Sequence, residues 1–264
     1  MTDTIRRAAE EWFGIKVDPG DVKKLQAWVL ENYGGESGLL RHGRVSPEIL
    51  RNVFSSGEAA AFLTVNETYF FREPAHFTFL LDLLPSFENK KTNLRICSAA
   101  VATGCEAYSI AMLIEAYNRG LERPLPYHID AFDLNPKVIE TACQGLYGPR
   151  ALREDGSSFH YMANSYLKKT ANQLQVDASL KENICFFVHN LMNEFPSKGY
   201  DLIFFRNAFI YFTPQYRERV LSNLSAALKE GGILIMGVSE TAGAHPPGMD
   251  AKNRDDVFYF QKPL

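Results

Sequence analysis

Apolar residues recur at helical spacing through the first quarter of the chain. Leu25, Trp28 and Val29 share one face of a helix in this pattern. Further along, Ser46-Pro47 offers a capping side chain followed by a first-turn proline, a combination typical of a helix start. The pattern therefore predicts a small helical domain over residues 1–62.

The next segment, residues 63–93, is predicted to be a linker that contains a helix of its own. Apolar side chains between residues 77 and 84 fall on one face of that helix. Pro85 is expected to end it, because proline lacks the amide hydrogen that a helix interior requires. The polar stretch 88–93 is then expected to form a boundary loop.

Short apolar runs alternate with capped helices from residue 94 onward. This alternation is typical of βαβ units, so residues 94–264 are expected to form an α/β domain with a parallel sheet. One helix is predicted over about 105–118, and others begin at Asn135-Pro136 and at Thr213-Pro214. The last of these is expected to end at Gly231-Gly232. The predicted strands cover residues 94–99, 128–133, 184–188, 201–205, 233–238 and 257–261.

Residues 149–183 interrupt the alternation. They are polar and contain only short alternating pieces. We interpret them as an insertion, which fits either a small antiparallel β-subdomain or a plain surface excursion.

Composition narrows the class of protein. The chain has 264 residues, 46% of them hydrophobic, and a net charge of −3, so neither nucleic acid nor an acidic membrane is an expected partner. Its four cysteines are scattered, the polar start resembles no secretory signal, and no apolar run approaches a membrane span. The six histidines form no metal-binding motif. We therefore expect a cytoplasmic protein with reduced thiols, no metal and no membrane insertion.

The strip Asn66–Pro74 sets Arg72 beside three consecutive aromatic residues. A guanidinium group has a planar fork of donors that suits a carboxylate, so one hypothesis is a carboxylate-handling site. The alternative is an apolar loop that plugs the core, with Arg72 and Glu73 solvated at its edge. These residues alone leave both hypotheses open.

The first strand-to-helix turn, residues 99–106, is expected to line a ligand pocket, because open α/β sheets bind ligands beyond the carboxyl ends of their strands. Gly104 provides conformational freedom there, and Glu106 is placed to accept a hydrogen bond from a cationic amine. Asp133 ends the second strand and is placed to accept ribose hydroxyls. A dinucleotide would require a glycine-rich turn without an acid, so an amino-acid-bearing nucleoside such as S-adenosylmethionine fits better.

Five ordered motifs resemble the CheR family of chemotaxis-type protein-glutamate O-methyltransferases. They are residues 66–74, 98–112, 132–135, 190–191 and 205–212, and the likeness continues through 231–232 and 237–240. The resemblance implies a class I, Rossmann-like methyltransferase sheet with an N-terminal helical domain and a small inserted β-subdomain. It implies S-adenosylmethionine as the cofactor, with S-adenosylhomocysteine as product, and methyl ester formation on glutamates of chemoreceptor cytoplasmic helices.

The resemblance also assigns site residues. It implies catalytic roles for Arg72 and Tyr211. The residues implied to contact the cofactor are Asn66, Thr68, Arg72, Glu106, Asp133, Asn190, Leu191, Arg206 and Asn207.

Three departures from the family pattern qualify what it implies. Cys105 and Ala107 stand where the family has an acid and a proline, which bears on cofactor affinity. Residues 1–62 carry 8 basic against 9 acidic side chains and are thus near neutral, whereas the helical domain of the family commonly carries a basic helix that docks on receptor helices; this bears on which receptor is the substrate. Residues 157–183 contain no glycine, so we expect no tethering to a receptor C-terminal pentapeptide. A monomer is the usual state of the family.

Two alternatives to a receptor methyltransferase remain. One is a small-molecule methyltransferase of the same fold, against which the helical domain and the strip around Arg72 argue. The other is a cofactor-binding but non-catalytic signalling partner, which the altered residues Cys105 and Ala107 suggest.

Overall fold

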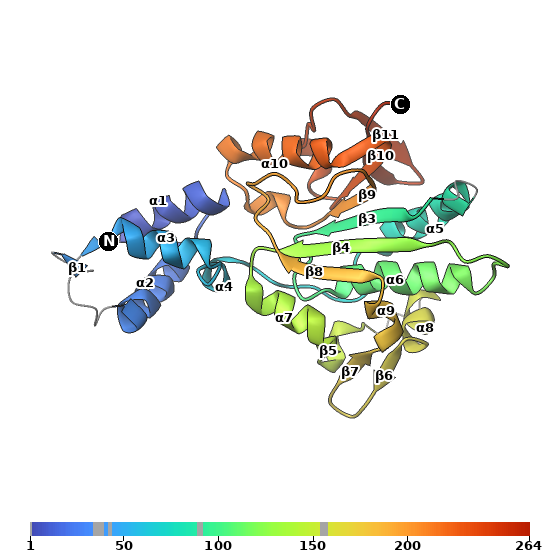
Figure 1. Ribbon diagram of the computed structural model, residues 1–264, viewed down its shortest axis with the longest axis horizontal. Coiled ribbons are helices and arrows are strands. Elements are labelled where there is room, and N and C mark those ends of the chain that lie inside the picture. Colours follow the sequence, from blue (N-terminus) through green and yellow to red (C-terminus); the bar gives the residue numbers. More distant parts are fainter. Residues whose placement is uncertain (1, 34–39, 42–43, 89–91, 154–157) are drawn as a thin grey trace.

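The computed structural model places an open, twisted sheet at the centre of the molecule, with a group of helices at one end of it (Figure 1). The structure describes residues 2–33, 40–41, 44–88, 92–153 and 158–264.

Seven strands form the central sheet in the order β11-β12-β10-β9-β3-β4-β8. The five strands from β10 to β8 run parallel, whereas β12 is antiparallel to both β10 and β11. The strand bounds are β3 Leu94–Ala99, β4 Tyr127–Asp133, β8 Ile184–Val188, β9 Tyr200–Phe205, β10 Leu228–Met236, β11 Asp250–Arg254 and β12 Val257–Gln261. The predicted α/β class is confirmed.

Helices cover both faces of this sheet, so the strands at its centre, β3, β4 and β9, are buried on both sides. Leu202 and Phe204 of β9 join the core formed with α5 (Pro74–Glu88) and α6 (Cys105–Asn118). Their neighbours Ile203 and Phe205 join the opposite core, which includes α10. The remaining helices of this region are α7 Pro136–Gln144 and α10 Pro214–Ala227, with short 3-10 turns η1 Pro149–Ala151, η2 Phe209–Tyr211 and η3 Thr241–Gly243.

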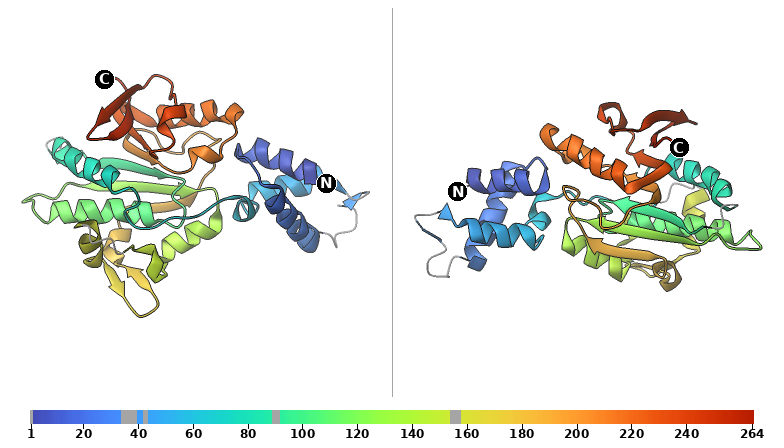
Figure 2. Two further views of the ribbon diagram at one scale, coloured as in Figure 1. Left: turned by 180° about the vertical axis from the view of Figure 1, so that it is seen from behind. Right: turned by 45° about the horizontal axis from the view of Figure 1, so that its top comes forward.

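The N-terminal region is helical, as predicted. Its elements are α1 Thr2–Phe13, α2 Pro19–Tyr33, β1 Leu40–Arg41, β2 Arg44–Val45, α3 Pro47–Ser55 and α4 Ala60–Leu63. The predicted cap of α3 is confirmed, since the Ser46 hydroxyl accepts a hydrogen bond from the Ile49 amide at 3.2 Å. Figures 1 and 2 show that this region lies at the end of the sheet toward which the carboxyl ends of β3, β4 and β8 point.

The insertion contains a three-stranded antiparallel sheet of order β5-β7-β6, flanked by two short helices. Its elements are β5 Leu146–Tyr147, α8 Ser158–Asn164, β6 Leu167–Lys169, β7 Leu174–Val176 and α9 Ala178–Lys181. Of the two alternatives left open by the sequence, the antiparallel subdomain is therefore correct. The first strand lies just before the predicted start of the insertion at residue 149.

Two local predictions were wrong, and one strand was missed. Pro85 does not end α5 but lies inside its last turns, where Leu84 and Phe87 remain buried. The helix from Pro214 ends at Ala227, not at Gly231-Gly232; the two glycines lie within β10, where the register with β9 shifts. Strand β11 was not predicted at all. Of the predicted boundary loop 88–93, residues 89–91 lie outside the described part of the chain.

None of the helices in the described residues is long and apolar enough to cross a membrane.

Candidate active site

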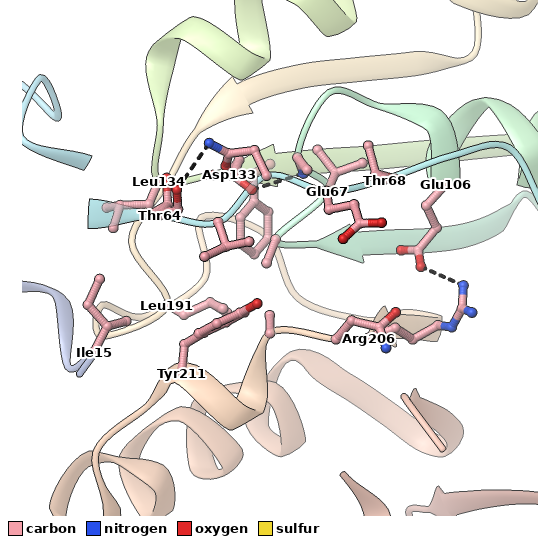
Figure 3. A pocket seen from close by; sticks show the side chains of 18 of the residues that line it. Ile15, Thr64, Glu67, Thr68, Glu106, Asp133, Leu134, Leu191, Arg206 and Tyr211 are labelled. Carbon is pink, nitrogen blue, oxygen red and sulfur yellow. Dashed lines mark hydrogen bonds and ion pairs between the residues drawn. The ribbon is translucent and has the colours of Figure 1, made fainter. Parts of the chain in front are cut away.

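One pocket opens at the carboxyl ends of β3, β4 and β9, next to the helical region. Strand β3 has β4 on one side and β9 on the other, so the chain changes direction across the sheet here, as at ligand sites of open α/β folds. Figure 3 shows side chains from segments far apart in the sequence facing this cavity. All ten predicted site residues line it: Asn66, Thr68, Arg72, Glu106, Asp133, Asn190, Leu191, Arg206, Asn207 and Tyr211.

Asp133 joins the two turns that form the inner wall. One of its carboxylate oxygens accepts a hydrogen bond from the Ala102 amide at 2.9 Å, and the other accepts from the Asn135 amide at 3.0 Å. Burial raises the pKa of Asp133, although these backbone hydrogen bonds oppose the shift. The carboxylate therefore orders the turns after β3 and β4 at the edge of the pocket.

Gly104 makes the turn before α6 possible. Its φ of +90° lies in the region that favours glycine, and a Cβ atom at this position would lie 2.8 Å from the Cβ of Ala142. The close approach brings α6 against α7. It also sets the start of α6, and hence Glu106, at the pocket wall.

Glu106 and Arg206 form a nearly buried ion pair, with 2.9 Å between Oε2 and Nη1. Arg206 also pairs with Glu73 at 3.1 Å and donates to the carbonyl of Arg72. Its side chain is only 2% exposed. The second oxygen of Glu106 accepts a hydrogen bond from Ser98 at 2.7 Å. Arg206 thus links the start of α6 to the strip, with two acids compensating its charge.

Glu73 was predicted to be solvated if the strip plugged the core, but it takes part in this buried network. Its other oxygen accepts a hydrogen bond from the Asn207 amide group at 2.9 Å. Burial opposes ionisation of Glu73, yet the close approach of His76, the Asn207 bond and the Arg206 charge outweigh it and hold its pKa below the usual range. Glu73 is therefore an ionised anchor for Arg206 and Asn207.

The two hypotheses for the strip describe different residues of it. Phe70 and Phe71 do plug the core, where Phe71 stacks on Phe159 at 5.1 Å and its amide donates to the Ser109 hydroxyl at 2.9 Å. Arg72 faces the pocket instead. Its Nη1 donates to the carbonyl of Glu67 at 3.0 Å, and no acid of the described residues pairs with it.

Asn207 continues the wall after β9 in a left-handed conformation, with φ of +57°. Its amide donates at 2.7 Å to Glu240, which is 2% exposed and also accepts from the amides of Gly237 and Ile210. Burial raises the pKa of Glu240. A Cβ atom at Gly237 would lie 2.6 Å from the Glu240 carboxylate, so a side chain there would displace the carboxylate from the amides that it accepts from. Residues 237–240 belong to the segments that resemble the family, but no role was predicted for Glu240.

The helical region contributes to the pocket directly, which the sequence did not predict. Phe13 and Ile15 line the cavity beside Tyr211, whose ring projects into it in Figure 3. The backbone of residues 14–16 is tied to residues 211–213, for example by the Lys16 amide, which donates to the Tyr211 carbonyl at 2.7 Å. No local pattern in residues 13–15 could have indicated this long-range contact.

Asn190 also connects the helical region to the wall of the pocket. Its side-chain amide donates to the carbonyl of Trp12 at 2.6 Å, and its oxygen accepts from the Met192 amide at 2.9 Å. Leu191 adds an apolar side chain to the wall. The neighbouring His189 also lines the cavity, and its Nε2 is buried with no partner among the described residues. Burial lowers its pKa, so the imidazole is neutral at pH 7.

The unusual residues Cys105 and Ala107 lie in the core beneath Glu106 and not among the residues lining the pocket. Burial raises the pKa of the Cys105 thiol to about 12, so it stays protonated. The departures from the family pattern therefore leave the pocket-facing acid unchanged.

Backbone strain concentrates around this pocket. Five of the seven non-glycine residues with positive φ in the described chain belong to its strip or turns: Phe71, Glu73, Ala100, Ala102 and Asn207. Such conformations persist only where the surrounding structure enforces them, and they cluster at functional sites. No group of three potential metal ligands occurs among the described residues.

The doubly wound sheet and a pocket with acids after β4 and at the start of α6 define a class I, Rossmann-like methyltransferase. Residues 66–254 match the family described as CheR methyltransferase, SAM binding domain. The chain belongs to this family, and its cofactor is S-adenosylmethionine.

Named relatives agree with this assignment. A chemotaxis protein methyltransferase of Vibrio parahaemolyticus is 35% identical over 182 residues, which cover 68% of this chain and 66% of the relative. One of Listeria monocytogenes is 32% identical, over 77% of this chain and 76% of the relative. A probable biofilm formation methyltransferase of Pseudomonas aeruginosa is 33% identical, over 79% of this chain and 50% of the relative. The chain thus spans just under two thirds of the first of these proteins.

Proposed function

We propose that this protein transfers a methyl group from S-adenosylmethionine to glutamate side chains on the cytoplasmic helices of a chemoreceptor, forming glutamyl methyl esters. Membership of the CheR family and the names of the relatives support this function. One observation carries it further. Of the two arginines that line the pocket, Arg206 is compensated by two acids, whereas Arg72 has no acid partner among the described residues. Arg72 is therefore the guanidinium free to receive a substrate carboxylate.

The donor and acceptor groups of the pocket suit the cofactor. Glu106 offers a carboxylate for its ammonium group, Asp133 offers one for its ribose, and Leu191 and Ile15 provide an apolar wall for its base. The partnerless Nε2 of His189 supplies one further buried polar atom in the same wall. When bound, S-adenosylmethionine supplies an electrophilic methyl group on a positively charged sulfur.

The task left to the protein is orientation. A glutamate with a pKa of about 4.3 is already ionised at neutral pH, so no general base is required. In our proposal, Arg72 aims the substrate carboxylate while Tyr211 and the aromatic strip exclude water. Among the described residues, Arg72 is held by a hydrogen bond to the Glu67 carbonyl and by no acid, which leaves its side chain able to adjust. A tighter grip would stabilise the ground state and slow the reaction.

Function also suggests a division of the chain. We assign residues 1–62 to a helical domain that helps receive the substrate, residues 63–93 to the connecting segment with the strip, and residues 94–264 to the methyltransferase domain with its insertion. We further propose that the protein acts in the cytoplasm as a monomer and is not tethered to a receptor C-terminal pentapeptide. Pentapeptide binding at micromolar strength would contradict the last point.

A transfer assay tests the proposal. The protein is incubated with methyl-labelled S-adenosylmethionine and a receptor cytoplasmic fragment, and base-labile label on the fragment is measured. Label that appears and is released by base supports glutamyl ester formation. Binding of S-adenosylhomocysteine without any transfer would instead favour a non-catalytic signalling partner. Transfer only to small molecules would favour a small-molecule methyltransferase.

A further inference from the structure

A second depression, of about 700 Å³, lies beside the pocket and shares one wall with it. Residues 67–69 line both, so the strip separates the two. We call this depression the arginine groove and define it by Glu67, Tyr69, Arg150 and Arg153. None of the functions assigned so far uses it.

The groove presents two exposed guanidinium groups. That of Arg153 lies 3.6 Å from the centroid of the Tyr69 ring, and its Nη2 is 3.7 Å from a carboxylate oxygen of Glu67. This ion pair is loose, because the two side chains are 57% and 74% exposed. Arg150 is exposed and has no acid partner among the described residues. Among the described residues that line the groove, two guanidinium groups thus lie beside a single carboxylate, that of Glu67.

The groove is fixed relative to the pocket. The Phe70 amide donates to the carbonyl of Ala151 at 2.8 Å, which joins the strip to the turn that carries both arginines. The ring of Tyr69 is also 5.9 Å from the Arg72 guanidinium, so the same aromatic ring contacts both the pocket arginine and Arg153 of the groove. A ligand seated at Arg72 thus meets a second cationic site at a set distance.

This local positive charge contrasts with the rest of the chain. The net charge is −3, and the helical region carries 8 basic against 9 acidic residues. The overall charge of the protein would therefore attract an acidic substrate only weakly, so electrostatic attraction has to come from local clusters of basic side chains.

We infer that the arginine groove binds acidic side chains that flank the target glutamate, about one helical turn away on the same face of the substrate helix. The inference rests on the proposed function and adds a specificity to it. Residues three or four positions apart share a helix face, so a target glutamate at Arg72 brings such neighbours toward Arg150 and Arg153. The substrate carboxylate competes with Glu67 for Arg153, and Arg150 is open to it without competition.

Two synthetic helical peptides provide the test. Each contains one target glutamate, and one peptide has aspartates three and four residues to either side where the other has asparagines. Fluorescence anisotropy in the presence of S-adenosylhomocysteine gives Kd for each, and methyl transfer gives kcat/KM. The wild-type protein should prefer the aspartate peptide, and the preference should vanish at about 0.5 M salt.

Single substitutions then separate docking from folding. Arg150→Gln and Arg153→Gln should each reduce the preference for the aspartate peptide about threefold, the scale of an exposed ion pair. Glu67→Gln should increase it, since it removes the competing carboxylate. Arg119→Gln is the matched control, because Arg119 is also exposed and lies 4.7 Å from a tyrosine ring, that of Tyr166, away from the groove. It should leave the preference unchanged.

The outcomes distinguish this inference from the proposed function. Equal binding of both peptides by the wild type, or equal losses for both peptides in the arginine variants, would overturn the role of the groove. If neither peptide receives a methyl group, the proposed function fails, while anisotropy still decides whether the groove selects acidic flanks.

Discussion

Replacing Arg206 by methionine should destabilise the fold strongly, because it leaves two nearly buried acids without their cation. The side chain of Arg206 is 2% exposed, and those of its partners Glu106 and Glu73 are 13% and 24% exposed. Methionine keeps most of the volume of the arginine stem, so lost packing contributes little. The change therefore isolates the charge network beneath the pocket.

The expected loss follows from the burial of these groups. Removing one partner of a buried ion pair costs about 3–5 kcal/mol, and the partial exposure of the acids reduces this to about 2–3 kcal/mol in free energy of unfolding. For a chain of this size the loss corresponds to a fall of about 5–10 °C in Tm. Adding Glu73→Gln to Arg206→Met removes one of the two acids left without a cation. The free energy of unfolding lost in the double variant should therefore be smaller, by about 1–2 kcal/mol, than the sum of the losses in the two single variants.

Urea unfolding followed by circular dichroism measures all three variants at pH 7. Isothermal titration with S-adenosylhomocysteine checks in parallel whether the pocket survives. A free energy of unfolding for Arg206→Met within about 0.5 kcal/mol of the wild type, which is the usual scatter of surface substitutions, would refute the reasoning. Strict additivity in the double variant would also count against it.

Four further changes test other parts of the site. Arg72→Ala should remove most methyl transfer while S-adenosylhomocysteine still binds in calorimetry; near-normal transfer would contradict its aiming role. Asp133→Ala should weaken cofactor binding about tenfold or more, since it removes both a polar contact and the order of two turns; unchanged affinity would exclude this role. Gly104→Ala should destabilise the protein by about 1–3 kcal/mol in urea unfolding, whereas the control Gly243→Ala, with open space around it, should not. Because the folded pKa of Glu73 is lowered, its stabilising contribution is present above its unfolded pKa of about 4.3 and declines as pH falls toward the folded value. The stability difference between the wild type and Glu73→Gln should thus shrink below about pH 4, and a difference that grows there would be inconsistent with this sign.

Strands buried on both faces were the easiest part of the fold to predict. The short run 94–99 is mostly apolar and ends in small residues, and β3 has those bounds. Strand β11, by contrast, is exposed along its whole length, Asp250–Arg254, so it has no hydrophobic pattern and depends on pairing with β12. Pro85 misled the prediction because a proline near a helix end can be tolerated when Leu84 and Phe87 hold the last turns by burial.

The residues of the candidate site also differ in how well they could be predicted. Motif residues such as Glu106 and Asp133 could be found because each lies at a predicted strand end or helix start. Ile15 lies in none of the motifs, and its role arises from the pairing of residue 15 with the distant residue 212. Glu240 lies in the matched segment 237–240, but its specific role could not be predicted, because it accepts a hydrogen bond from the distant amide of Asn207. The left-handed backbone conformation at Ala100 and Ala102 could not be predicted either, because alanine rarely adopts it and so does not indicate it in a sequence.

The attachment of residues 14–16 to residues 211–213 makes the helical region and the cofactor pocket thermodynamically linked. Any partner that shifts the helical region on binding also moves Ile15 in the pocket wall. Linkage is reciprocal, so the factor by which such a partner alters cofactor affinity is the factor by which the cofactor alters affinity for the partner. If the substrate protein binds to the helical region, as we propose, the protein loaded with cofactor and the empty protein would bind that substrate with different affinities.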